Sequence, residues 1–381
     1  MTEPLREAVR KVAEAALRDE RIVGAVIAVA HRGETVMIEP FGLADREAGR
    51  PMMPDAIFRL ASVSKPIVTA AVVALAEQGR VDLDGPVSTW LPEFRPRFGD
   101  TRPDITLRHL LTHTSGLSYP FREAPDGPYH RADISSGMDQ PGLAAAEQLH
   151  RLAAVPLLFT PGTQWNYSLG VDVAALAAAA AAGTSLQELV ADLVTDPLGM
   201  HDTAFSVTDI ARLVQPYGVD ASGRPVRMTD GYAGPTLTGT AARFHPSRIL
   251  DPASYPSGGS GLAGTAGDVL AFIEALRRGG APILGEAAAR SMVTPQISAE
   301  IRDVLESGWS YALGTQVIAE PARITGPERP GAFKGSGGYG HSWFADPALE
   351  TSVVALTTSA PEGVRGRLVT DVRQAVYTAV S

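Results

Sequence analysis

Residues 58–65 of this chain read Phe58-Arg59-Leu60-Ala61-Ser62-Val63-Ser64-Lys65, directly before an Ala-rich segment with helical character. Ser62 and Lys65 match the pattern S-x-x-K, and in a helix that begins here they would lie one turn apart on the same face. A serine hydroxyl is a weak nucleophile until a base takes its proton, and a partly desolvated lysine amine can assist. The pattern predicts a nucleophile at Ser62 beside Lys65. Ser64 is a rival nucleophile, and a serine near a helix start with a surface lysine would give the same letters.

The two ends of the chain show strand and helix patterns that the middle does not share. The N-terminal end predicts a helix over 4–17 and a hairpin of strands 21–30 and 35–41. The C-terminal end predicts strands over 308–317, 335–345 and 352–358 and a helix over 363–380. The middle is rich in Pro, Gly and short Ala/Leu segments, of which 171–182 predicts a buried helix. We expect an α+β protein, with a discontinuous sheet domain (1–80 and 251–381) and an inserted, mainly helical domain (81–250).

A tyrosine follows a Pro-Gly turn in Pro161-Gly162-Thr163-Gln164-Trp165-Asn166-Tyr167-Ser168-Leu169-Gly170. A phenol held near an ammonium can have its pKa lowered enough to act as a base. Tyr167 is therefore a candidate proton carrier, although a tyrosine that caps the buried helix after it would look the same.

Glycines recur near the C-terminal end, in Gly335-Ser336-Gly337-Gly338-Tyr339-Gly340-His341-Ser342-Trp343-Phe344. Glycine in a strand lets a ligand approach the backbone closely. The run predicts a strand beside a ligand site, and a Gly-rich hairpin is the alternative.

Composition and spacing exclude several other kinds of site. The chain has no Cys, which excludes disulfides, thiolate metal sites and a Cys nucleophile. Its formal net charge is −9 and it has no block of basic residues, so we expect no nucleic-acid partner. His109 and His113 are four residues apart, but no Glu follows the first and no third ligand is evident, so we expect no metal and no cofactor. No G-x-S-x-G is present, which argues against an α/β-hydrolase nucleophile.

The apolar pattern predicts neither a signal peptide nor a membrane span. Residues 1–20 are charged throughout. The longest apolar run, around 171–182, contains Asp172 and is too short to cross a bilayer. We expect a cytoplasmic protein without a membrane partner; its oligomeric state is left open.

Taken in order, these motifs resemble those of the serine β-lactamase and penicillin-binding-protein superfamily. Within it they are most similar to the class C β-lactamase-like esterases, the family VIII carboxylesterases. Three further strings carry the resemblance: Leu110-Leu111-Thr112-His113-Thr114-Ser115-Gly116-Leu117, Pro197-Leu198-Gly199-Met200 and Tyr255-Pro256-Ser257-Gly258-Gly259. The motifs span nearly the whole chain in the order found in the family.

The resemblance implies an antiparallel sheet flanked by helices, with the active site in the cleft beside the helical domain. It also implies a covalent acyl-enzyme: Ser62 attacks a carbonyl, Lys65 assists and Tyr167 moves protons. The oxyanion hole would be the backbone N–H groups of Ser62 and Gly338. The expected substrate is a small ester, bound by a larger set of residues: Tyr129, Leu169, Gly335, Ser336, Gly337, His341 and Trp343.

Two positions depart from the β-lactamase pattern. The motif Y-x-N is Tyr167-Ser168-Leu169 here, and K-T-G falls on Gly335-Ser336-Gly337, with Lys334 able to substitute in another register. The side chains of Leu169 and Gly335 offer no hydrogen bond to a substrate carboxylate, and the aromatic that the esterase branch often has at the second slot is missing. We therefore expect hydrolysis of small carboxylic esters, with acyl transfer to an alcohol or amine as the alternative. A β-lactamase, a DD-peptidase or a non-catalytic binding protein is less favoured.

Overall fold

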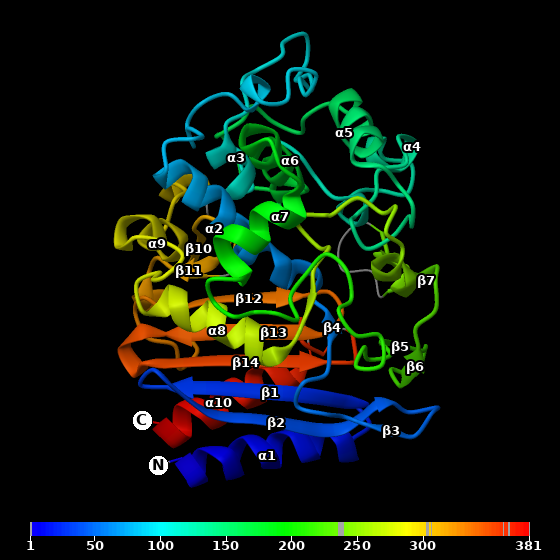
Figure 1. The fold of residues 1–381 in the computed structure, drawn as a ribbon, viewed down its shortest axis with the longest axis vertical. Helices are drawn as coiled ribbons and strands as arrows, with labels where there is room; N and C mark the ends of the chain where they lie inside the picture. The colour runs from blue at the N-terminus through cyan, green and yellow to red at the C-terminus, as the bar shows by residue number, and fades with distance from the viewer. Residues whose placement is uncertain are drawn as a thin grey trace.

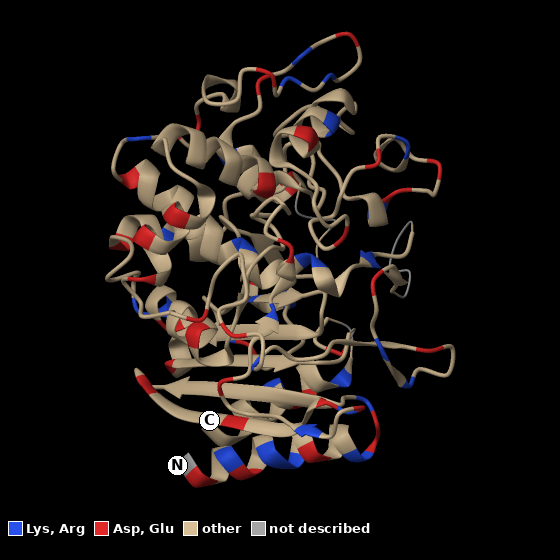
Figure 2. Ribbon diagram, turned by 45° about the vertical axis from the view of Figure 1, so that its right-hand side comes forward, with Lys and Arg blue, Asp and Glu red and all other residues tan. Residues whose placement is uncertain are grey.

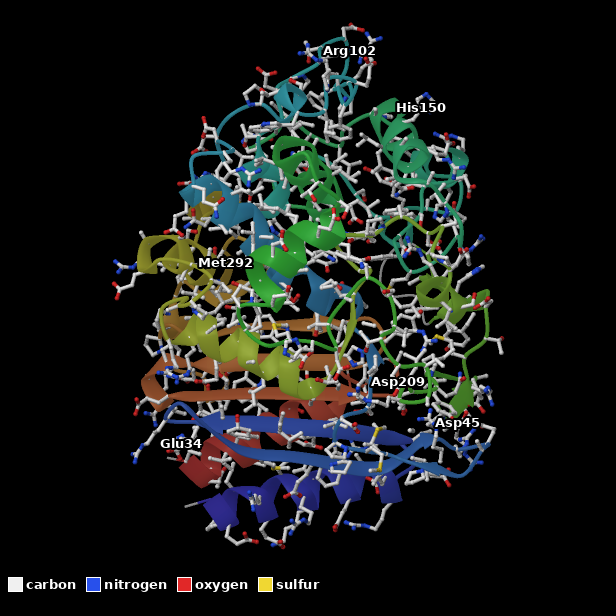
Figure 3. The ribbon with its side chains drawn as sticks, viewed as in Figure 1. Glu34, Asp45, Arg102, His150, Asp209 and Met292 are labelled. Atoms are coloured by element: carbon white, nitrogen blue, oxygen red, sulfur yellow. The ribbon has the colours of Figure 1, made fainter. Side chains whose placement is uncertain are left out.

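A computed structural model describes residues 2–234, 240–301, 305, 307–360, 362–364 and 366–380, and it gathers the long strands into one sheet (Figure 1). The sheet has eight antiparallel strands in the order β10-β11-β12-β13-β14-β1-β2-β3. Their bounds are β1 (Gly24–His31), β2 (Glu34–Asp45), β3 (Arg50–Pro51), β10 (Trp309–Tyr311), β11 (Gln316–Ile318), β12 (Phe333–Gly337), β13 (His341–Asp346) and β14 (Thr351–Thr357). Glu34 and Asp45, labelled in Figure 3, mark the two ends of β2. The fold class is α+β, as predicted.

The helices and the small two-stranded sheets surround this sheet. The helices are α1 (Thr2–Arg18), α2 (Ser64–Glu77), α3 (Leu107–Leu111), α4 (Pro128–Arg131), α5 (Ala145–Ala154), α6 (Gly170–Ala182), α7 (Leu186–Val190), α8 (Ala266–Arg277), α9 (Glu286–Val293) and α10 (Arg367–Val380). The short strands pair as β4 (Phe58–Arg59) with β9 (Ala263–Gly264), β5 (Tyr217–Val219) with β6 (Pro225–Arg227), and β7 (Tyr232–Ala233) with β8 (Arg243–Phe244). Acidic and basic residues recur along the length of α1 (Figure 2).

The two ends of the chain meet in the centre of the sheet, because β1 pairs with β14. Side chains of β1 alternate between two cores: Val26 and Ala28 pack with α2 and α8, whereas Ala25 and Ile27 pack with α1 and α10. Both faces of β1 are therefore covered, which explains why its sequence is apolar without alternation. Side chains fill the space between α8 and the sheet (Figure 3).

Two of the predicted strands fold back on themselves. Segment 308–317 forms β10 and β11, with Gly314 at φ 79° in the turn between them. Segment 335–345 falls within the hairpin of β12 and β13, where Gly340 has φ 112°. Such positive φ values are readily adopted by glycine, so the glycines mark reversals inside what sequence patterning treated as single strands. The division into domains at residues 80 and 250 stays a prediction.

In the described part of the chain, no single helix is long and apolar enough to cross a membrane. The segments Gly170–Ala182 and Leu186–Thr195 reach that length and composition only together, and they are bent by 92° relative to each other.

Candidate active site

Ser62 lies on a short 3-10 turn, Ala61–Val63, that leads directly into α2. The turn is anchored on one side, because Leu60 N–H donates to the carbonyl of Leu262 (2.8 Å). Ala61 has φ 46°, a conformation unusual for a residue other than glycine and typical of a constrained functional turn. The backbone therefore fixes Ser62 at the start of a helix that is buried along nearly its whole length.

Lys65 and Tyr167 both meet Ser62 at its hydroxyl. Lys65 Nζ lies 3.1 Å from Ser62 Oγ and also donates to the carbonyl of Gly259 (2.8 Å). The Tyr167 hydroxyl lies 2.8 Å from the same Ser62 Oγ, within hydrogen-bonding distance. Lys65 is 2% exposed, and its Nζ lies 4.8 Å from the centre of the Tyr167 ring. The three residues named from sequence thus share one oxygen atom, which suits proton transfer to and from it.

The histidine His113 holds Tyr167 in place. The two ring centres lie 4.6 Å apart, and His113 Nδ1 accepts from Ser168 N–H (3.2 Å). On its other side, His113 Nε2 lies 3.1 Å from the hydroxyl of Tyr311. Burial keeps the pKa of His113 well below its usual value, so the ring is neutral. His109, the other histidine of the pair, takes a capping position, where its Nδ1 accepts from Thr106 N–H (3.3 Å).

A cavity of about 350 Å³ opens in front of Ser62. Seven of the predicted residues line it: Ser62, Lys65, Tyr167, Gly335, Ser336, Gly338 and Trp343. Lys334 lines it as well, with Nζ 3.7 Å from the centre of the Trp309 ring. The sequence analysis missed the apolar wall, which includes Phe121, Met138, Phe244 and Tyr311. These residues come from separate segments, so no local pattern joins them.

The glycine-rich strand β12 packs closely against the Ser62 turn. A Cβ atom at Gly337 would lie 2.5 Å from the carbonyl oxygen of Leu60, so only glycine lets the strand come this near. Gly338, the next residue, lines the cavity. This arrangement is compatible with an oxyanion hole formed by Ser62 and Gly338, which stays a prediction.

Four residues predicted to bind substrate do not line this cavity. Ser118 N–H donates to the hydroxyl of Tyr129 (2.7 Å), and Tyr129 borders a neighbouring cavity of about 380 Å³. Leu169 is fully buried at the start of α6. Gly337 is covered by Leu60, as described above. His341 begins β13, its Nε2 lies 2.9 Å from the carbonyl oxygen of Arg59, and burial lowers its pKa to about 4. For these four, packing of the core explains the residue better than contact with a substrate.

Comparisons with known proteins agree on the kind of protein to which this geometry belongs. The family model described as Beta-lactamase matches residues 9–377. The chain is 46% identical to Esterase EstB of Burkholderia gladioli over 372 residues, which cover 96% of this chain and 93% of that protein. Its structure is similar to that of EstCE1, described as a hydrolase with promiscuous acyltransferase activity, with a TM-score of 0.94, 39% identity and 99% of both chains covered. Acyltransferase calJ of Penicillium decumbens is 28% identical over 351 residues, covering 82% of this chain and 78% of that one.

Proposed function

Because this chain belongs to the beta-lactamase family, we propose that it is a serine carboxylesterase that hydrolyses small carboxylic esters through an acyl-enzyme on Ser62. The observation that carries the proposal is the meeting of Lys65 Nζ and the Tyr167 hydroxyl at Ser62 Oγ, at 3.1 and 2.8 Å. A serine in that position can lose its proton to either neighbour as it attacks a carbonyl.

The reaction follows from this geometry in two halves. In the first, Ser62 Oγ bonds to the carbonyl carbon of the ester, and its proton passes to the Lys65–Tyr167 pair. The C–O bond to the alcohol then breaks, and Tyr167 returns the proton to the departing oxygen. In the second half, water attacks the acyl-enzyme, gives a proton to the same pair and releases the acid, while Ser62 regains its hydrogen. Backbone N–H groups of Ser62 and Gly338 would stabilise the negative oxygen in both halves.

The walls of the cavity favour a neutral substrate of modest size. Aromatic and aliphatic side chains such as Phe121, Met138 and Phe244 form much of the surface in front of Ser62. Apolar walls with a few polar groups suit binding of a small organic molecule. An ester with a short acyl chain fits this description and leaves no charge without a partner.

Acyl transfer is the second candidate function. It is favoured by two similar proteins, because EstCE1 is described as having promiscuous acyltransferase activity and calJ is named an acyltransferase. In that reaction an alcohol or amine replaces water in the second half. Hydrolysis of p-nitrophenyl butyrate with and without added alcohol would separate the two, because transfer yields a new butyrate ester whereas hydrolysis yields butyric acid alone.

A fluorophosphonate probe tests the assignment of the nucleophile. The wild-type chain should be labelled on the peptide that contains Ser62, and Ser62→Ala should lose both labelling and ester hydrolysis. Ser64→Ala is the matched control, because Ser64 Oγ accepts from Leu262 N–H (3.1 Å) and so takes a structural position. Labelling that survives in Ser62→Ala and disappears in Ser64→Ala would contradict the proposal.

The cytoplasmic location stays a proposal that cell fractionation would test.

A further inference from the structure

A buried carboxylate, that of Asp172, lies near the amine of Lys65 at the position of Gly259. Asp172, in the first turn of α6, is 2% exposed, and its Oδ1 accepts from the hydroxyl of Ser257 (2.5 Å). Its other oxygen, Oδ2, has no hydrogen-bond partner among the described residues. A buried carboxylate oxygen without a partner is costly unless a nearby charge compensates for it.

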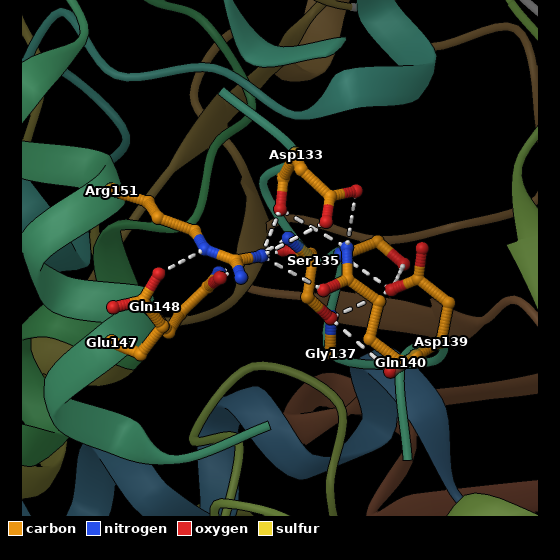
Figure 4. Close-up of polar contacts among 9 residues, drawn as sticks. Asp133, Ser135, Gly137, Asp139, Gln140, Glu147, Gln148 and Arg151 are labelled. Atoms are coloured by element: carbon orange, nitrogen blue, oxygen red, sulfur yellow. Dashed lines mark hydrogen bonds and ion pairs between the residues drawn. The ribbon is translucent and has the colours of Figure 1, made fainter. Parts of the chain in front are cut away.

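Another buried carboxylate of this chain shows the contrast. Asp139 Oδ1 accepts from the hydroxyl of Ser135 (2.7 Å) and from Ser136 N–H (2.8 Å), within the polar cluster drawn in Figure 4. The partners of Asp139 are neutral hydrogen-bond donors, which satisfy a carboxylate locally. Asp172 has the Ser257 hydroxyl and the Gly259 backbone as hydrogen-bonding neighbours, and beyond these it depends on its wider surroundings.

Three polar groups surround the same position next to Gly259. A Cβ atom at Gly259 would lie 2.5 Å from Asp172 Oδ2, 3.1 Å from the Tyr119 hydroxyl and 3.3 Å from Lys65 Nζ. The Tyr119 hydroxyl, like Oδ2, has no hydrogen-bond partner in the described part of the chain. Because residue 259 lacks a side chain, a carboxylate, a phenol and an ammonium group approach the same small space.

We propose that Asp172 is a positioning residue of the ester hydrolysis, acting through Lys65: its negative charge holds the proton on the Lys65 amine. This inference rests on the function proposed above. Lys65 Nζ lies 4.8 Å from the centre of the Tyr167 ring, and both side chains contact Ser62 Oγ. Asp172 thereby makes Tyr167 the group that takes the proton of Ser62, and Lys65 the cation that keeps it ready.

The other groups around Lys65 and Asp172 do not supply a negative charge in place of Asp172. Facing Lys65, His113 is neutral because burial keeps its pKa low, and Tyr119 is neutral because burial raises its pKa well above the usual value. Facing Asp172, the phenol of Tyr255 is neutral for the same reason. Among the described residues, Arg248 is a further cation near Asp172, and its guanidinium donates to the carbonyls of Asp139 (3.1 Å) and Tyr255 (2.7 Å).

Opposing influences act on the pKa of the Asp172 carboxyl. Burial is the largest of them and raises this pKa above its usual value, whereas the Ser257 hydrogen bond, the Lys65 charge, the Gly259 backbone and the Arg248 charge each lower it. The Lys65 charge is therefore one of the groups that favour the carboxylate form.

The direction of the pH effect does not depend on which member of the pair is the base. The active form arises when the Lys65–Tyr167 pair loses one proton, and a nearby carboxylate opposes that loss. Removal of the carboxylate should make the loss easier, so the acid limb of the pH–rate profile should move to lower pH. An opposite charge within about 4–6 Å shifts the pKa of an ionisable group by about one unit or more.

The experiment compares the pH dependence of kcat/KM for p-nitrophenyl butyrate in the wild type, Asp172→Asn and Asp172→Ala. We expect the acid limb of both variants to lie about one pH unit lower than that of the wild type. The pH dependence of fluorophosphonate labelling at Ser62 should shift equally, and it requires no turnover. Asp139→Asn is the control, and it should leave the acid limb of kcat/KM and the pH dependence of labelling unchanged.

Two results have distinct meanings. An acid limb that stays in place or moves to higher pH in the Asp172 variants, while the wild type hydrolyses the ester, would overturn the inference alone. Absence of ester hydrolysis and of Ser62 labelling in the wild type would overturn the proposed function.

Discussion

The indole of Trp343 lies in the space that a side chain at Gly335 would occupy. The two residues are directly opposite in the hairpin of β12 and β13. A Cβ atom at Gly335 would lie 2.6 Å from Trp343 Cζ2 and 2.8 Å from its Nε1. In the expected register, in which Gly335 takes the place of the β-lactamase lysine, an aromatic ring from the neighbouring strand fills that space. Position 335 itself has no aromatic side chain, as expected, and the ring beside it belongs to Trp343.

Gly335→Ala should destabilise the protein, because the added methyl group and the indole of Trp343 cannot share this space. Overpacking of this kind costs about 1–3 kcal/mol of unfolding free energy. Gly267→Ala in α8 is the matched control: its Cβ would lie 3.5 Å from the nearest side-chain atom, an ordinary contact, and helices favour alanine over glycine. Urea unfolding of both variants should show a loss in the first and none in the second. Equal effects would mean that the indole moves aside freely.

Simple esters with short acyl chains should be turned over far better than β-lactams. A β-lactam brings a carboxylate close to the reacting carbonyl, and a buried carboxylate needs a charged or hydrogen-bonding partner. At the two places where β-lactamases provide one, this chain has a fully buried Leu169 and the Gly335–Trp343 contact. The expected loss is several kcal/mol of transition-state stabilisation. A kcat/KM for nitrocefin as high as that for p-nitrophenyl butyrate would show that Lys334, which lines the cavity, supplies the charge instead.

The sequence predicted the chemistry of the site better than its walls. Short motifs contain the residues Ser62, Lys65 and Tyr167, and the spacing of these motifs reflects one helix turn and one Pro-Gly turn. The local sequence is therefore enough to identify them. The position of Trp343 over Gly335 depends on strand pairing, which the letters of a single segment do not contain. The role of Asp172 depends on a contact between α6 and the loop at Gly259, and sequence patterning treated it only as a charge inside an apolar helix.

The fold shows the same division. Helices 4–17 and 171–182 were placed within a few residues, because apolar spacing and an Ala-rich run are local signals. The sequence of segment 308–317 predicts one strand, because it contains nothing that distinguishes a turn glycine such as Gly314 from a strand glycine. Tyr129 was expected at the substrate, yet its hydroxyl bonds to Ser118 in the loop that it supports.

Acid should destabilise the protein partly through His341. Burial lowers the pKa of this residue to about 4, below the usual 6.5 of the unfolded chain. Between these values the unfolded state binds a proton that the folded state does not, so the unfolding free energy falls as pH drops from about 6.5 to about 4. The total is about 3 kcal/mol. His341→Gln should lower stability at pH 7 but show a smaller further loss at pH 5 than the wild type in urea unfolding. Parallel losses in the two proteins would place the acid sensitivity elsewhere.

Lys65 and Tyr167 should behave as one proton-transfer unit, because both side chains contact the same atom, Ser62 Oγ. Lys65→Ala or Tyr167→Phe alone should lower kcat by about 10²–10⁴, the usual contribution of general acid–base catalysis. Once one partner is missing, the other has no proton to pass on, so the double variant should be little slower than the slower single variant. Lys334→Ala is the control: this lysine lines the same cavity but has its Nζ over Trp309. Its effect should add to that of Tyr167→Phe, as expected for independent groups. Rate losses that multiply fully for the Lys65–Tyr167 pair would mean that each residue contributes on its own, and that the hydrogen bonds to Ser62 Oγ are not a shared path for the proton.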